Sequence, residues 1–192
     1  MAATAAPAAG GEVATHTPVD QLRRDPVLLA ACVRATLQPL LQKKVPEEWR
    51  DANGHVNIRH YMALFDDLEW EMAREWGLSD AHFKNGLGLF DLEHHVKYLR
   101  EVHIGDSVSA FYRILGVNRT PPLKRVHFMV YLANDTNGCV AATCEGVCCA
   151  SNLTTRASTP FPEKVANQIR RIGDQHAKLN WECPHHGSLD PR

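Results

Sequence analysis

Residues 51–61 read Asp-Ala-Asn-Gly-His-Val-Asn-Ile-Arg-His-Tyr. This stretch places a carboxylate, Asp51, before a glycine turn and then before the start of a helical segment. Gly54 can adopt a positive φ without a steric penalty and lets the backbone approach a ligand closely. The first turn of a helix has unpaired amides and a partial positive charge, so it stabilises an oxygen that gains negative charge. The stretch can therefore polarise and attack a carbonyl group.

The segment from Asn57 to about Trp76 is predicted to be a long amphipathic helix. Asn57 is a favourable N-cap residue, and Gly77 is a plausible stop. Apolar residues recur at spacings of three and four along one face: Ile58, Tyr61, Phe65, Leu68, Met72 and Trp76. Four acids are expected on the opposite, solvated face: Asp66, Asp67, Glu69 and Glu71.

The residues of the turn allow two interpretations. In the first, Asp-x-Asn-Gly is an ordinary turn sequence and Asn57 is an ordinary helix cap. In the second, Asp51 is a nucleophile or a general base that activates water beside the helix N-terminus. Chemistry alone leaves both open.

The rest of the chain favours an antiparallel sheet. Four strand-like runs cover about 88–100, 107–117, 123–134 and 139–151, and Asn137-Gly138 is a hairpin signal between the last two. A first strand is expected within 33–47, and short helices are expected at 19–31, 79–84 and 162–172. One long helix with a strand before it and four strands after it predicts an α+β domain, with the helix on one face of a curved antiparallel sheet.

The chain length bounds the number of domains. With 192 residues, we expect one domain at 19–174. Residues 1–18 are rich in Ala, Gly, Pro and Thr and are predicted to be a disordered extension. Residues 175–192 are predicted to be a flexible tail. This tail contains His176 and the run 183–186, whose Cys and adjacent His do not match a recognised four-ligand spacing, so no metal is expected.

Composition argues against several classes of partner. The formal net charge of −1 gives no strong field toward nucleic acid or a membrane surface. No apolar run approaches the ~20 residues of a membrane span, and no secretory signal is seen. The six cysteines include three in one apolar run, which is typical of reduced, buried thiols. A cytosolic location is the resulting expectation.

The opening stretch resembles the signature of the hotdog-fold acyl-CoA thioesterases of the 4-hydroxybenzoyl-CoA thioesterase type. In that family an Asp-x-x-Gly-His-x-Asn-x-x-x-Tyr motif joins the first strand to the central helix, and Asp51, Gly54, His55, Asn57 and Tyr61 occupy all of its defined positions. Downstream runs at 92–106 and 153–158 resemble the second strand and the exit of the last strand, in the expected order. The resemblance covers roughly residues 33–172.

This resemblance implies an acyl-CoA thioester hydrolase with a hotdog fold. Coenzyme A would be part of the substrate, and no separate cofactor is implied. The thioester carbonyl would meet the amides at 54–56. The residues expected in catalysis are Asp51, Gly54, His55 and Asn57. The residues expected to bind substrate are Val56, Tyr61, Glu93, His95 and Arg119.

Some of these assignments keep alternatives. Glu93 and His95 lie in a strand in which alternation sends His94 and His95 to opposite faces, so one histidine could reach the site or both could be structural. Arg119, in the basic run 119–125, suits CoA phosphates by charge but also suits a solvated loop. Some hotdog thioesterases place the catalytic carboxylate on the central helix, where Glu69 lies, but Asp51 argues against that arrangement here.

The pattern is most similar to thioesterases that accompany carnitine and betaine metabolism, whose acyl groups carry a quaternary ammonium. Trp70, Tyr98 or Phe90 is expected to face such a cation. Hotdog domains typically form dimers, and the dimers can pair again, so a homodimer or a tetramer is expected. Two other functions remain open: a hydroxyacyl-thioester dehydratase, and a protein that binds acyl-CoA without hydrolysing it.

Overall fold

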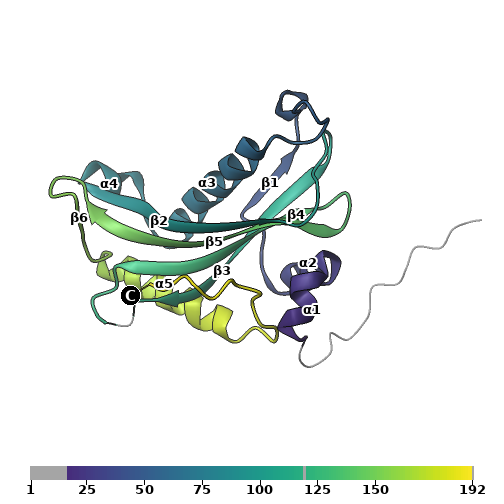
Figure 1. Ribbon diagram of the computed structural model, residues 1–192. Helices are drawn as coiled ribbons and strands as arrows, with labels where there is room; N and C mark the ends of the chain where they lie inside the picture. The colour runs from purple at the N-terminus through teal and green to yellow at the C-terminus, as the bar shows by residue number, and fades with distance from the viewer. Residues whose placement is uncertain (1–16, 119, 192) are drawn as a thin grey trace, which may run out of the picture.

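The computed structural model describes residues 17–118 and 120–191 (Figure 1). In these residues one antiparallel sheet of six strands has the order β1-β3-β4-β5-β2, with β6 paired to β5. The strands are β1 (Leu41–Lys44), β2 (Leu87–Tyr98), β3 (Ser107–Val117), β4 (Arg125–Asn134), β5 (Cys139–Asn152) and β6 (Ala157–Ser158). The predicted α+β arrangement is confirmed, because a long helix, α3, lies against one face of the curved sheet.

Helix α3 (Ile58–Glu75) is the predicted central helix. The Asn57 side chain caps it by accepting a hydrogen bond from the Arg59 N–H at 3.1 Å. After Trp76 the chain turns at Gly77, which has a φ of +94°. The apolar face of the helix is buried, including Phe65 and Leu68, but Glu69 on the same helix is also buried. The expectation that Glu69 lies on the solvated face is therefore wrong.

Alternation along the central strands builds two cores. On β4, Val126, Phe128, Val130 and Leu132 pack with α3, whereas Met129, Tyr131 and Ala133 face the other side of the sheet. Because both faces are covered, β3, β4 and β5 are buried over most of their lengths. The first strand is shorter than expected: α2 occupies part of the predicted range, and only 41–44 pair with β3.

Helices α1 (Val19–Arg24) and α2 (Pro26–Thr36) cover the face of the sheet opposite α3 (Figure 1). The chain that follows the last helix also reaches this face. Trp181 and Cys183 are buried there, and the Trp181 Nε1–H donates to Thr36 at 2.9 Å. The segment after residue 174 was expected to be a flexible tail. In the structure, buried apolar side chains anchor it to the sheet.

Helix α5 (Glu163–Ala177) runs along β3, beyond the stretch that β1 covers. The Ile114 N–H of β3 donates to Nδ1 of His176 at 3.0 Å, so α5 satisfies a backbone group at the edge of the strand. Two short elements complete the fold: the 3₁₀ helix η1 (Glu47–Trp49) and α4 (Asp80–Lys84). Of the N-terminal extension, residues 1–16 lie outside the described residues. None of the described helices is both long and apolar enough to cross a bilayer.

Candidate active site

The turn between η1 and α3 holds Asp51 in a fixed position. The Gly54 N–H donates to the Asp51 carbonyl at 3.1 Å, and the Asp51 N–H donates to the His55 carbonyl at 2.9 Å. Gly54 has a φ of +88°, a conformation that other residues rarely adopt, which is why the turn requires glycine. The Asn53 N–H closes a side-chain turn by donating to Asp51 Oδ1 at 2.7 Å.

The Asp51 carboxylate lies beside an imidazole. His55 Nδ1 is 3.4 Å from Asp51 Oδ2, and the Asp51 side chain retains 15% of its exposure. Partial desolvation opposes ionisation of Asp51, but the hydrogen bonds from Asn53 and the nearby His55 together hold the pKa of the carboxyl below its usual value. Asp51 is therefore ionised at neutral pH.

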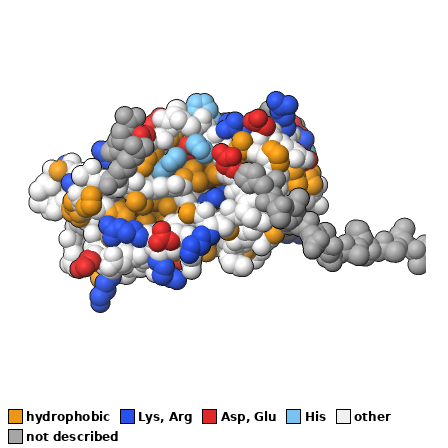
Figure 2. Space-filling view, turned by 90° about the horizontal axis from the view of Figure 1, so that it is seen from below, with side chains coloured by type: hydrophobic (Ala, Val, Ile, Leu, Met, Phe, Trp, Pro, Cys, Tyr) orange, Lys and Arg blue, Asp and Glu red, His pale blue; other side chains and the backbone are white. Residues whose placement is uncertain are grey.

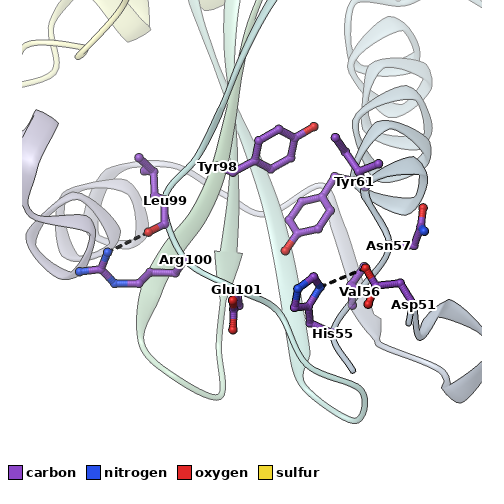
Figure 3. Close-up of a pocket in the computed structure, with 10 residues that line it drawn as sticks. Asp51, His55, Val56, Asn57, Tyr61, Tyr98, Leu99, Arg100 and Glu101 are labelled. Carbon is purple, nitrogen blue, oxygen red and sulfur yellow. Dashed lines mark hydrogen bonds and ion pairs between the residues drawn. The ribbon is translucent and has the colours of Figure 1, made fainter. Parts of the chain in front are cut away.

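Asp51 borders a cleft of about 370 Å³ at the N-terminal end of α3 (Figure 3). One wall is the turn and the start of α3; the other is the end of β2 and the loop after it. The lining residues are Asp51, His55, Val56, Asn57, Ile58, Tyr61, Tyr98, Leu99, Arg100 and Glu101. The structure thus brings together five of the predicted site residues: Asp51, His55, Val56, Asn57 and Tyr61.

Two of the three backbone amides at 54–56 differ from the expected oxyanion site. The Val56 N–H donates to the Val102 carbonyl at 2.9 Å, and the Gly54 N–H closes the turn, so neither is free to meet a substrate oxygen. For the Ile58 N–H, at the first position of α3, no acceptor is found in the described part of the chain. Ile58 also lines the cleft, so the helix N-terminus presents its positive end there.

Two tyrosines form an aromatic wall of the cleft. Tyr61 and Tyr98 meet edge to face, with ring centroids 5.3 Å apart. The Tyr61 hydroxyl accepts a hydrogen bond from the Val102 N–H at 3.1 Å, which ties α3 to the loop after β2. Tyr98 is 47% exposed, so its ring is available to a ligand. Of the aromatics expected to face a cation, only Tyr98 borders this cleft; Trp70 and Phe90 do not.

The remaining predicted residues are not brought to the cleft. Glu93 is exposed on β2, and the His95 ring stacks on the His186 ring with centroids 4.1 Å apart. His186 in turn donates its N–H to Glu145, on the face opposite α3, where Figure 2 shows histidine side chains gathered beside a hollow with a hydrophobic floor. Alternation along β2 explains this placement, because Tyr98 and His94 share the face toward α3. Arg119 lies outside the described residues.

A second cluster of polar groups lies between α3 and the sheet, away from the cleft lining. The His94 Nε2 is 3.5 Å from Glu69 Oε1 and 3.7 Å from Asp91 Oδ1. Burial and the neighbouring Asp91 raise the pKa of Glu69 to about 9. Helical periodicity could have found Glu69, because it directly follows the buried Leu68 and lies four residues after the buried Phe65.

With this geometry defined, comparison with known proteins identifies the family. A profile of the thioesterase-like superfamily matches residues 45–169, which contain α3, all the strands after it and every residue that lines the cleft. The chain belongs to the thioesterase-like superfamily. The hotdog resemblance predicted from the motif is confirmed.

Two curated relatives are similar to about seven-tenths of this chain. An L-carnitine dehydrogenase/betainyl-CoA thioesterase of Rhizobium meliloti is 28% identical over 141 residues, which are 73% of this chain and 28% of that protein. A betainyl-CoA thioesterase of Pseudomonas aeruginosa is 29% identical over 133 residues, covering 69% of this chain and 81% of that protein. The chain thus spans less than a third of the length of the Rhizobium protein.

Two solved structures have the same fold as this chain. A Staphylococcus aureus protein solved in complex with CoA superposes with a TM-score of 0.69 at 27% identity, covering 80% of this chain and 96% of that one. A putative thioesterase of Pseudomonas putida superposes with a TM-score of 0.65 at 26% identity, covering 80% and 95%. Both alignments include most of the present chain and nearly all of the neighbour, so the fold is shared.

Proposed function

We propose that this chain hydrolyses an acyl-CoA thioester to a free acid and CoA. The observation that carries the proposal is the ionised Asp51 carboxylate, which borders the same cleft as the N-terminus of α3. Similarity to proteins named as betainyl-CoA thioesterases supports the same chemistry.

The reaction needs an attacking oxygen and a place for the developing negative charge. Asp51 either attacks the thioester carbonyl or takes a proton from the water that attacks it. The carbonyl oxygen lies at the Ile58 N–H, where the helix dipole and the free amide stabilise it as it becomes negative. The C–S bond then breaks and the CoA thiolate takes up a proton. If water attacked, the acyl group leaves directly as a carboxylic acid. If Asp51 attacked, the acyl group is first held on Asp51 as a mixed anhydride, which a water molecule hydrolyses to the carboxylic acid and free Asp51. His55 and Asn57 hold the turn and orient water.

The acyl group that fits the cleft best is one with a quaternary ammonium. Tyr61 and Tyr98 offer aromatic edges and faces, and Asp51 and Glu101 add negative charge to the same cleft. Aromatic faces attract such a cation by about 0.5–2 kcal/mol. This choice also agrees with the substrate named for the relatives.

Arg100 is our candidate for the first contact with the CoA phosphates. It lines the cleft, and it also lines the adjoining hollow, where Arg24 lies. Two guanidinium groups in one hollow suit a pyrophosphate by bidentate hydrogen bonding, and the carboxylates of Asp20 and Asp25 line the same hollow.

A homodimer formed through β2 is the assembly we propose. β2 is the last strand of the sheet, and it exposes Phe90 and Leu92 at its unpaired edge. A second copy pairing there would cover both the edge and the apolar side chains. The described cysteines are all free, which suits the reducing cytosol as the compartment.

The test is release of CoA thiol, followed with dithiobis-nitrobenzoate. The substrates are betainyl-CoA and its neutral isostere 3,3-dimethylbutanoyl-CoA, which differ only in the charge of the trimethyl group. We expect hydrolysis of both, faster with betainyl-CoA, and a loss of about 10³-fold or more in kcat for Asp51→Asn. Asp67→Asn, which removes an exposed carboxylate from the same region, is the matched control.

Near-normal turnover by Asp51→Asn excludes the mechanism. Binding of CoA esters without thiol release by the native chain excludes hydrolysis and favours a binding protein. Equal rates for the two isosteres refute the choice of a cationic acyl group but leave the hydrolase in place. Tyr98→Leu should reduce the preference for betainyl-CoA by about 2- to 30-fold, which is the range of the cation–π energy.

A further inference from the structure

Three side chains of different chemistry converge beneath the central helix. Glu69 comes from α3, His94 from β2 and Cys144 from β5, and one donor atom from each lies within 4.8 Å of the other two. The helix and the two strands that carry these residues are distant in sequence, and the packing of α3 on the sheet brings them together. None of the three residues lines the Asp51 cleft.

Two of these three candidate ligand groups have an atom with no hydrogen-bond partner in the described residues. Glu69 Oε1 and His94 Nε2 are both buried and without one in the described residues, although they lie 3.5 Å apart. The Glu69 side chain is nine-tenths buried. A buried polar atom without a partner typically costs about 1–3 kcal/mol, so a group that engages both atoms would remove a real penalty.

We propose that Glu69, His94 and Cys144 form a zinc site. A carboxylate oxygen, an imidazole nitrogen and a thiolate sulfur are the ligands that Zn²⁺ takes in proteins, whereas calcium and magnesium prefer oxygen alone. Asp91 supplies the fourth ligand, because its Oδ1 is 3.7 Å from His94 Nε2.

The geometry requires only a small closure. Bond lengths of about 2.0–2.3 Å place tetrahedral donors roughly 3.3–3.8 Å apart. The Glu69–His94 and His94–Asp91 distances already match, and the widest pair among Glu69, His94 and Cys144, which lies within 4.8 Å, has to close by about 1 Å. Gly146 makes room for the imidazole: a Cβ there would lie 2.9 Å from His94 Cδ2.

Binding is a ligand exchange without oxidation or reduction. Cys144 is buried and enters as a thiol; its proton passes to the buffer as the Zn–S bond forms. Any proton on Glu69 is released in the same way. The site would fasten α3 to the β2 and β5 strands, so the metal would stabilise the fold.

The experiment uses the full chain, stripped with a chelator and titrated with Co²⁺ and then Zn²⁺. We expect one metal ion per chain, a thiolate-to-cobalt charge-transfer band, and a Zn²⁺-dependent rise in unfolding temperature that follows mass action. Cys144→Ser should abolish the band, and His94→Gln should weaken Zn²⁺ binding by about tenfold or more. These measurements do not use thioester hydrolysis, so they stand or fall separately from the proposed function.

Matched controls separate this site from other thiols and imidazoles. Cys139→Ser and Cys183→Ser remove buried thiols elsewhere, and His103→Gln removes an exposed imidazole. All three should keep the band and the affinity. Far-UV circular dichroism of each metal-free variant shows whether it is folded. If Cys144→Ser does not fold, His94→Gln tests the site instead. A chain that binds no metal, or that loses metal only through the control substitutions, overturns the proposal.

Discussion

Gly146 tests how tightly the sheet is packed where β5 passes between its neighbours. In the register of the sheet Gly146 is opposite His94 on β2 and Phe128 on β4. A Cβ at Gly146 would lie 2.5 Å from Phe128 Cζ and 2.9 Å from His94 Cδ2, against 3.4 Å or more for ordinary contact. The Phe128 ring is fully buried, so it has no free space into which to move.

The expected cost of Gly146→Ala follows from two opposing effects. Overpacking of a core costs about 1–3 kcal/mol, and the loss of backbone freedom in the unfolded chain offsets about 0.4–1 kcal/mol of that. We therefore expect a net loss of about 1–2 kcal/mol in the free energy of unfolding. Gly116→Ala is the control, because a Cβ at Gly116 would meet nothing within 4 Å and its φ is not in the left-handed region. That variant should be neutral or slightly more stable.

Urea denaturation of both variants and of the native chain provides the measurement, and the comparison is valid if the m-values agree. The two alanine variants should differ by more than about 1 kcal/mol. If Gly146→Ala unfolds at the same urea concentration as Gly116→Ala, the rings of Phe128 and His94 do not close over β5 as described, and the geometric reasoning fails.

Three further predictions concern stability. Burial and Arg113 lower the pKa of His176 to about 4. As the pH falls, the unfolded chain binds a proton at His176 before the folded chain does, so the free energy of unfolding should fall by about 2 kcal/mol from pH 6.5 to pH 4. His176→Asn should flatten this pH dependence in urea titrations. Tyr61→Phe leaves the Val102 N–H without its acceptor and should cost about 1–3 kcal/mol in the same assay, whereas an unchanged midpoint would show that water replaces the hydroxyl. Trp181→Ala should cost about 3–5 kcal/mol by calorimetry, and a cost near zero would mean that the tail does not anchor.

Periodicity and turn chemistry predicted much of the fold because they are local. The α3 helix begins at the predicted cap and ends within two residues of the predicted stop, since the cap and the apolar spacing are both written in neighbouring residues. The first strand, expected within 33–47, was overestimated, because 33–36 are the last turn of α2, which packs on the far side of the sheet. Local pattern does not distinguish burial in a helix from burial in a strand over so few residues.

The turn motif predicted which residues lie around the cleft on the helix side. It did not predict which amides remain free, because the Val56 N–H is used by Val102, a residue distant in sequence. The opposite wall contains Tyr98 and Arg100, and these residues reach the cleft only because the end of β2 lies beside the start of α3 in the folded chain. Glu93 and His95 were assigned to substrate, but strand alternation turns them away from α3.

The amino-acid sequence by itself determined the α+β class, the capped central helix and the glycine turn that carries Asp51, since each depends on steric and hydrogen-bonding preferences within a few residues. Tertiary structure alone decided that Glu69 meets His94 and Cys144. Donors that are 25 and 50 residues apart in the chain come within bonding reach only when α3 packs on strands β2 and β5. Burial there removes water, and water is what would otherwise satisfy these polar atoms.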